Sequence, residues 1–263
     1  LEFKENADAN LSLIQEELRD GAYRIGEYRQ FEIREPKPRL ISALGFKDRL
    51  VQHALMNVIA APFDRLLLPY TFACRAGLGT HAGVRHLQSR LRQGRATHYL
   101  QTDFRAYFAS IDRAVLHRLY ARTIGCQWTL DLLARIVPAT GRGLPIGSLT
   151  SQHAANLYAN DLDRFIHFDL KPLGWARYMD DVVVLGDDAD ALHEYRHCLE
   201  TLADRTRGLA LSRWKVAPVS RGIDFLGYRL WPRHKLLRKR SVTRAKQTIR
   251  RYLEHDEPAR LSR

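Results

Sequence analysis

The most constraining feature of the sequence is residues 177–185, RYMDDVVVL, where two acidic residues stand between two apolar segments. Only a tight turn fits between these segments, so the pattern predicts a β-hairpin. Aspartate is common in turns because its side chain bonds to nearby backbone groups. Two adjacent carboxylates beside β-branched core residues, however, repel each other unless a cation lies between them. Asp180 and Asp181 are therefore either turn residues or ligands of a cation.

A third acid supports the cation interpretation. Residues 98–104 have the pattern of a strand, and Asp103 lies near its end. Carboxylates from two neighbouring strands can bridge two Mg²⁺ ions about 3.5–4 Å apart, which is the arrangement used for phosphoryl and nucleotidyl transfer. Mg²⁺ is bound by few protein carboxylates and completes its shell with water and substrate phosphate. The three aspartates therefore predict transfer chemistry on a phosphate-containing substrate.

The charge balance points to the same class of substrate. The 263 residues include 42 Lys and Arg against 29 Asp and Glu, a net charge of +13, which favours a polyanionic partner and nucleic acid above all. Three scattered cysteines argue against a disulfide scaffold or a cysteine-rich zinc module and fit a reducing compartment. No apolar run approaches the about 18 residues that a membrane span needs, so we expect no membrane association. The chain begins with Leu1 rather than Met, and we expect it to be part of a longer protein.

The hydrophobic spacing predicts a mixture of helices and strands. We expect a rigid basic connector over 35–39, a helix that begins after Ser110 or Asp112, further helices over 9–18, 47–69, 150–168 and 187–202, and strands over 40–42, 98–104 and 225–230. These elements show no regular βαβ alternation, so we predict an α+β fold.

Several segments, in order along the chain, resemble the motifs of reverse transcriptases. Tyr178 to Asp181 is the YMDD box, and 103–108 resembles the box that carries the first catalytic aspartate. The remaining segments resemble fingers motifs (38–41 and 47–52), the segment beneath the nascent base pair (143–152) and the primer grip (223–228).

This resemblance implies a right-hand polymerase fold. We expect fingers over residues 1–95, an antiparallel-sheet palm over 96–228 with a helical insertion near 113–140, and the start of a thumb over 229–263 that is cut short at Arg263. The basic tail, from Arg233 through Arg251, would contact duplex phosphates, although a solvated basic helix gives the same pattern.

The resemblance also implies roles for individual residues. Asp103, Asp180 and Asp181 would hold two Mg²⁺ ions, for which Mn²⁺ can substitute. Tyr107 or Phe108 would be a steric gate against a 2′-hydroxyl, and we favour Phe108. Lys215 would protonate or steady the departing pyrophosphate, although a plain surface lysine fits as well. For some of the other candidates for contact with the dNTP or the template, a solvated charge or packing in the core is an equally good explanation. These other candidates are Arg39, Lys47, Arg49, Arg75, Phe104, Ile146 and Gln152.

One dipeptide narrows the resemblance. Ser151 is followed by Gln152, where most prokaryotic reverse transcriptases carry proline, and this pair is typical of the enzymes of diversity-generating retroelements. Segments 35–43, 79–83 and 217–222 are also similar to that group. The resemblance implies error-prone copying of a template-repeat RNA at adenines, an RNA–DNA duplex product, a small basic accessory protein, and a bacterial or phage-encoded cytoplasmic enzyme.

Other functions remain open from the sequence. A retron-like, group II-like or antiviral reverse transcriptase fits the same motifs, and so does a non-catalytic RNA-binding relative. Residues 193–197 read H-E-x-x-H, the pattern of zinc hydrolases, in which two histidines four residues apart share one helix face. The extension that continues this pattern in metzincins is absent, because Cys198 and Leu199 follow.

Overall fold

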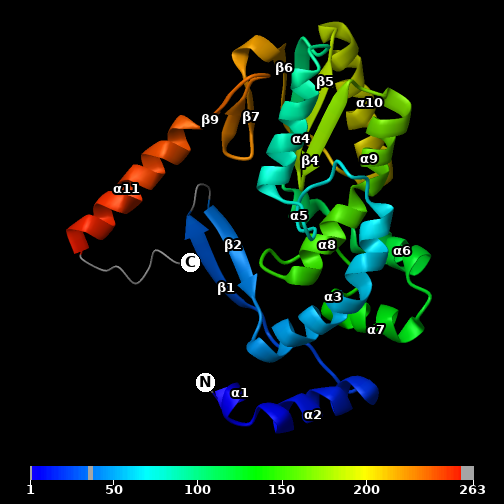
Figure 1. Cartoon of the computed structure of the whole chain (residues 1–263). Coiled ribbons are helices and arrows are strands. Elements are labelled where there is room, and N and C mark those ends of the chain that lie inside the picture. Colours follow the sequence, from blue (N-terminus) through cyan, green and yellow to red (C-terminus); the bar gives the residue numbers. More distant parts are fainter. Residues whose placement is uncertain (1, 35–37, 256–263) are drawn as a thin grey trace. The chain divides into compact units, whose positions relative to one another are not determined.

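The computed structural model describes residues 2–34 and 38–255 and divides the chain into two compact units. Unit 1 combines Leu1–Pro69, Phe104–Phe165 and Leu199–Ser212, and unit 2 combines Tyr70–Asp103, Ile166–Cys198 and Arg213–Arg263. Residues 35–37 of the expected connector and residues 256–263 of the tail lie outside the described residues, and Pro38 and Arg39 begin a strand. Figure 1 shows the helices and strands of both units.

Unit 1 is mostly helical. Its elements, including those that it shares with unit 2, are α1 (Glu2–Glu5), α2 (Ala7–Arg19), β1 (Arg29–Arg34), β2 (Pro38–Ala43), α3 (Phe46–Leu66), α5 (Tyr107–Ser110), α6 (Arg113–Thr123), α7 (Gln127–Ile136), α8 (Leu149–Tyr158), α9 (Asn160–Phe165) and the end of α10 (Ala189–Arg207). Strands β1 and β2 pair antiparallel, and α3 packs against α8 (Figure 1). The expected cap is confirmed, because Asp112 accepts a hydrogen bond from the backbone N–H of Val115 at the start of α6.

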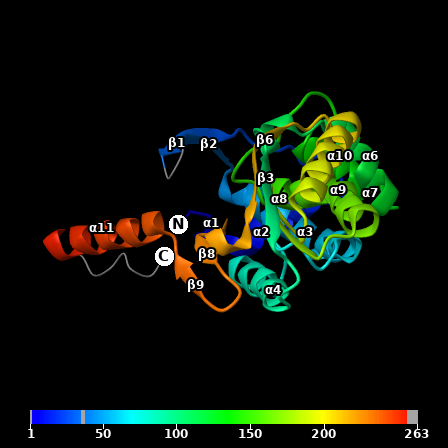
Figure 2. The same ribbon diagram turned by 90° about the horizontal axis from the view of Figure 1, so that it is seen from above.

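Unit 2 is built around an antiparallel sheet of order β4-β5-β3-β6. Its elements, again with shared ones included, are α4 (Thr80–Arg92), β3 (His98–Phe104), a π-helical turn (Ile166–Leu170), β4 (Gly174–Tyr178), β5 (Asp181–Gly186), β6 (Leu211–Pro218), a 3₁₀ turn (Val219–Arg221), β7 (Ile223–Phe225), β8 (Tyr228–Leu230), β9 (Lys235–Leu237) and α11 (Lys239–His255). Helix α4 lies along β4 and also contacts β8 of a second, three-stranded sheet, β7-β8-β9 (Figures 1 and 2). Buried apolar side chains from α4 and from both sheets form one core, which includes Val84, Leu87, Tyr99, Val183, Ile223 and Phe225.

Two expected elements are interrupted. The prediction of a single strand over 225–230 is wrong. Leu226 and Gly227 have φ of 49° and 85° and turn the chain back, so that Phe225 pairs with Tyr228. Positive φ at both central residues suits a two-residue hairpin turn, which the leucine had disguised.

The helix expected over 150–168 is also broken. It ends at Tyr158, whose carbonyl accepts a hydrogen bond from Nε of Arg207 at 2.9 Å, and resumes at Asn160. A carbonyl satisfied by a side chain from elsewhere in the chain no longer needs its helical partner, and this permits the break.

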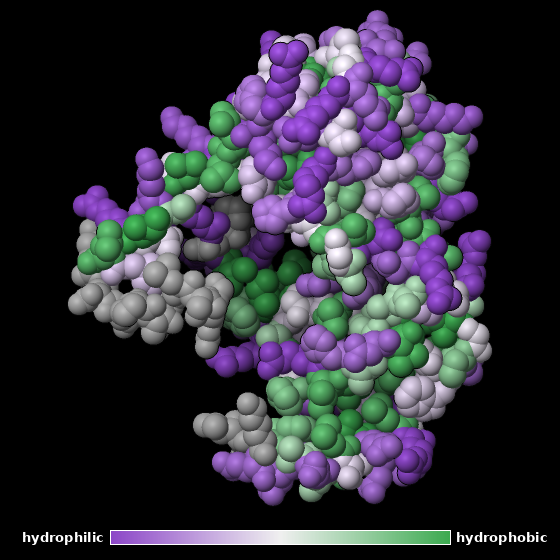
Figure 3. Space-filling view, viewed as in Figure 1, coloured by the Kyte–Doolittle hydropathy of each residue, from purple (hydrophilic) through white to green (hydrophobic). Residues whose placement is uncertain are grey.

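The face drawn in Figure 3 is largely polar. Figure 3 shows hydrophilic side chains over much of the visible face, with hydrophobic ones in patches between them. Helix α11 carries arginines and lysines together with exposed Ile249 and Leu253. Within the described ranges every helix is too short or too polar to cross a membrane.

Candidate active site

The aspartate pair lies at the predicted hairpin. Strands β4 and β5 pair antiparallel with Tyr178 opposite Asp181, so Met179 and Asp180 alone make the turn. Met179 has φ of 55°, in the left-handed region, which costs a non-glycine residue about 1 kcal/mol or more. The turn is held from within, because the almost fully buried Arg177 donates from Nη1 to the carbonyl of Met179 at 2.9 Å. The hairpin prediction is confirmed.

Asp103 lies beside this hairpin. Strands β3 and β5 pair antiparallel with Thr102 opposite Val182, so Asp103 and Asp181 occupy the ends of neighbouring strands. The backbone N–H of Arg213 on β6 donates to Oδ1 of Asp103 at 3.1 Å. A cavity of about 360 Å³ is lined by both carboxylates together with Gln101, Thr102, Arg213, Trp214 and Lys215. The prediction of carboxylates on two neighbouring strands therefore holds for Asp103 and Asp181.

Burial makes the ionised form of Asp181 unfavourable. The pKa of Asp181 is raised to about 6, chiefly by burial and also by the neighbouring charges of Asp180 and Asp103. A hydrogen bond from Gln101 and the charge of Arg238 act in the opposite direction and lower this pKa. Carboxylates that are buried and repel one another fit a divalent cation, which would offset both costs. In the described part of the chain, however, no three His, Cys, Asp or Glu side chains converge as a formed metal site.

The cavity is bordered by two aromatic contacts. The Nζ of Lys215 lies 5.3 Å from the centre of the Tyr99 ring, so the exposed lysine is held beside the carboxylates. Trp214 lines the cavity and also contacts two residues of α10. The guanidinium of Arg196 is 4.6 Å from the centre of its ring, and the ring of His193 is 5.6 Å away in an edge contact. His193 of the H-E-x-x-H pattern therefore packs against a tryptophan.

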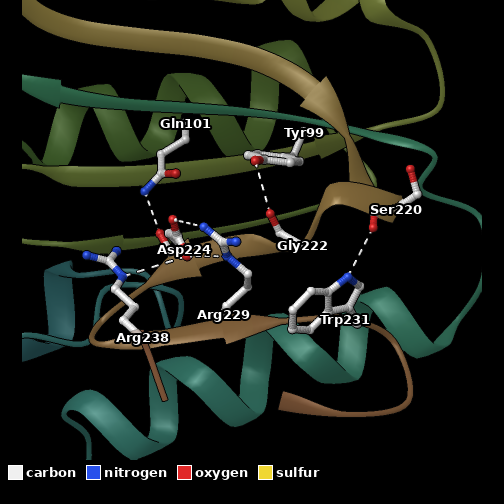
Figure 4. A network of polar contacts seen from close by, with 8 residues as sticks. All are labelled: Tyr99, Gln101, Ser220, Gly222, Asp224, Arg229, Trp231 and Arg238. Atoms are coloured by element: carbon white, nitrogen blue, oxygen red, sulfur yellow. Dashed lines mark hydrogen bonds and ion pairs between the residues drawn. The ribbon is translucent and has the colours of Figure 1, made fainter. Parts of the chain in front are cut away.

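A polar network joins β3 to the second sheet, and the sequence did not predict it. Gln101 on β3 donates to the backbone carbonyl of Asp224 on β7, and the side chain of Asp224 is paired with Arg229 and Arg238 (Figure 4). The same figure shows Tyr99 bonded to the carbonyl of Gly222. A signal was present: Gln101 is two residues before Asp103, and strand residues two apart share a face.

Several of the residues predicted to contact the dNTP or the template lie in unit 1, among them Arg39, Lys47, Arg49 and Ile146. Arg39 is exposed on β2, Arg49 is exposed beside Phe46, and Nζ of Lys47 is paired with Glu17 at 2.6 Å. The segment containing Ile146 lies next to β2, because its carbonyl accepts a hydrogen bond from the backbone N–H of Ser42.

The two gate candidates differ in burial. Tyr107 is buried and its hydroxyl donates to the carbonyl of Ala155 at 2.5 Å, whereas Phe108 is partly exposed. Phe104 is buried, and Gln152 is partly buried on α8. In unit 2, Nη1 of Arg75 donates to the carbonyl of Thr71 at 2.9 Å.

Comparison with solved structures shows the fold. The structure of apo telomerase from Candida tropicalis matches with a TM-score of 0.63 and 9% identity over 82% of this chain and 49% of that chain. Telomerase from Candida albicans in complex with a fragment of telomeric RNA matches with a TM-score of 0.57 and 10% identity, over 82% of this chain and 47% of the other. The α+β polymerase fold predicted from the sequence is thereby confirmed.

Comparison of sequences shows the family. The group II intron-encoded protein LtrA of Lactococcus lactis subsp. cremoris is 22% identical over 173 residues, which are 61% of this chain and 28% of LtrA. An uncharacterised 91 kDa protein in the cob intron of Schizosaccharomyces pombe is 28% identical over 130 residues, 46% of this chain and 16% of that protein. The chain thus spans under a third of these relatives. The family profile described as reverse transcriptase (RNA-dependent DNA polymerase) matches residues 33–230, three-quarters of the sequence, and the chain belongs to this family.

Proposed function

We propose that this chain is the catalytic part of an RNA-directed DNA polymerase that extends a primer along an RNA template. The observation that carries the proposal is the shared cavity of Asp103 and Asp181, at the ends of paired strands inside a segment that matches the reverse transcriptase family. Its direct test is primer extension on RNA with dNTPs and Mg²⁺. Full-length DNA product is expected, and no product from a folded protein that binds the primer–template would contradict it.

The proposed division of roles follows from the site. Asp103, Asp180 and Asp181 would hold divalent ions, which supply the positive charge that a 3′-hydroxyl nucleophile and a triphosphate require. Lys215, which lies over Tyr99 at the same cavity, would give a proton to the leaving pyrophosphate. Arg39, Arg49 and Arg75 remain candidates for triphosphate oxygens, and Lys47 would have to exchange its pairing with Glu17 to join them.

We propose Phe108 as the sugar gate. The ring of Tyr107 is buried and its hydroxyl is satisfied by Ala155, which supports a core role and leaves the partly exposed Phe108 as the ring that can meet a nucleotide. We expect Phe108→Ala to admit ribonucleotides, lowering the preference for dNTP over rNTP by roughly 10²-fold, or ~3 kcal/mol. Incorporation of single dNTPs and rNTPs measures the ratio, and Tyr107→Phe is the matched control, expected to keep it. A dNTP preference that survives in Phe108→Ala would contradict the assignment.

The finer proposal is that the enzyme belongs to a diversity-generating retroelement, copies a template-repeat RNA with errors at adenines and works in a bacterial cytoplasm with a small basic accessory protein. The Ser151–Gln152 pair supports this proposal. The similarity to LtrA favours a second candidate, a group II-like enzyme. An adenine-biased error spectrum on a defined RNA distinguishes the first from the second.

Within the retroelement proposal, Gln152 and Ile146 face the templating pair and control its accuracy. We expect Gln152→Ala to change misincorporation opposite adenine by several-fold while leaving errors at other bases nearly constant. Alanine is preferred to proline here because residue 152 lies within α8, where proline removes a backbone donor. Sequencing of the cDNA measures the spectrum. An unchanged spectrum in Gln152→Ala and in Ile146→Phe would remove this role.

Helix α11 would bind the RNA–DNA duplex product. Its arginines and lysines, among them Arg244, Lys246 and Arg251, suit phosphate contacts, which are independent of sequence and weaken steeply with salt.

A further inference from the structure

The side chain of Gln101 touches both the candidate catalytic carboxylate and the second sheet. Its Nε2 donates to the backbone carbonyl of Asp224 at 2.7 Å and to Oδ1 of Asp181 at 3.3 Å. Both partners are oxygen acceptors, so the amide nitrogen must face them. Each of its two hydrogens is donated to one of these oxygens. Gln101 and Asp103 occupy the same face of β3, and both line the cavity.

The acceptor on β7 is itself fixed in place. Asp224 lies opposite Arg229 in the β7–β8 ladder, and the two side chains form a bidentate ion pair with distances of 2.8 and 2.9 Å (Figure 4). A bidentate arginine–carboxylate pair restricts both groups more than a single contact does. On either side of Asp224, Ile223 and Phe225 are fully buried in the core. The carbonyl that holds Gln101 is therefore a rigid anchor.

We propose that Gln101 is a positioning residue that fixes the carboxylate of Asp181 by anchoring it to the backbone of β7. This inference rests on the proposed function, because Asp181 is there taken to hold a divalent ion. An amide suits this role because it donates to both oxygens and carries no charge that would compete with a cation for Asp181. Groups that orient metal-binding carboxylates through hydrogen bonds typically contribute about 10-fold or more to metal affinity or activity.

The test compares Gln101→Met with Gln88→Met. Methionine has a similar length but no N–H donor. Gln88 is the matched control, because its amide also donates to a backbone carbonyl, that of Trp231 at 3.1 Å, but does not line the cavity. Binding of Mn²⁺ is measured without turnover, by electron paramagnetic resonance of the free ion, together with the melting temperature and the kcat and KM of primer extension.

We expect Gln101→Met to weaken Mn²⁺ binding and to lower kcat, each by about 10-fold, with the KM for dNTP changed less. Gln88→Met should keep the Mn²⁺ affinity of the wild type even where its melting temperature falls. Gln101→Asn, which keeps the donor on a shorter side chain, should lie between Gln101→Met and the wild type. If Gln101→Met fails to fold, the Mn²⁺ affinity of Gln101→Asn decides the question in the same way.

Failure of the proposal and failure of the proposed function give different results. Equal Mn²⁺ affinity and equal kcat in Gln101→Met and the wild type would overturn the positioning role while polymerisation stands. Equal weakening in the Gln101 and Gln88 variants would overturn it too, because a general structural effect would then explain both. A wild type that binds Mn²⁺ in a Gln101-dependent way but extends no primer would instead remove the polymerase function and leave the positioning role supported.

Discussion

Asp181→Asn is expected to abolish primer extension, with a loss of about 10³-fold or more, equivalent to ~4 kcal/mol of transition-state stabilisation. Asparagine keeps the shape of the side chain but removes the charge that would bind a divalent ion. The same should hold for Asp103→Asn, because the two carboxylates share one cavity. Single-turnover extension of a labelled primer on RNA measures the rate.

Folding supplies the control for this result. Asp181 is partly buried among like charges, so removing its charge relieves repulsion in the absence of metal. We therefore expect Asp181→Asn to melt, in metal-free buffer, at or above the temperature of the wild type. An inactive variant that is also unfolded would not assign the residue to the chemistry, and an active, folded variant would refute the metal-site assignment.

Arg177→Leu is expected to destabilise the fold strongly. Arg177 is 1% exposed, and its guanidinium donates a hydrogen bond to the carbonyl of Met179. Leucine would therefore leave polar groups unsatisfied beside a residue in the left-handed region. Such a loss costs about 3 kcal/mol, which corresponds to a fall in melting temperature of roughly 6–10 °C in a chain of this size. Thermal unfolding followed by circular dichroism measures the shift.

Arg221→Leu is the matched substitution, because it removes the same charge from an exposed position of unit 2. It should leave the melting temperature within about 1 °C of the wild type. Arg177→Lys should lie between the two, since lysine keeps the charge but presents a single donor group. If Arg177→Leu melts with the wild type, the buried arginine does not hold the hairpin turn.

The central part of the site could be predicted because it is local. The apolar residues around Asp180 and Asp181 require a hairpin, and an antiparallel neighbour is the simplest partner for the strand that ends near Asp103. Helices with strong apolar spacing, such as α2 and α3, were also predicted within a few residues.

The parts that could not be predicted depend on long-range contacts. Gln101 and Asp224 are 123 residues apart, and only the packing of β7 beside β3 brings them together. Lys47 looked like a free phosphate ligand, but Glu17, thirty residues earlier, folds back to pair with it. The turn at Leu226 was not predicted, because a leucine with positive φ is rare. It is set by long-range features, the pairing of Phe225 with Tyr228 and the burial of Phe225 and Leu230 in the core.

The sheet order has a consequence for self-association. In the described part of the chain, strand β6 is at one edge of the four-stranded sheet, and edge strands in general offer backbone groups to which strands of other molecules can pair. Arg213 and Lys215, exposed on this edge, oppose such pairing because two like-charged edges repel each other. The charges that border the cavity therefore also act against edge-to-edge pairing, and neutralising Arg213 and Lys215 together would remove this protection.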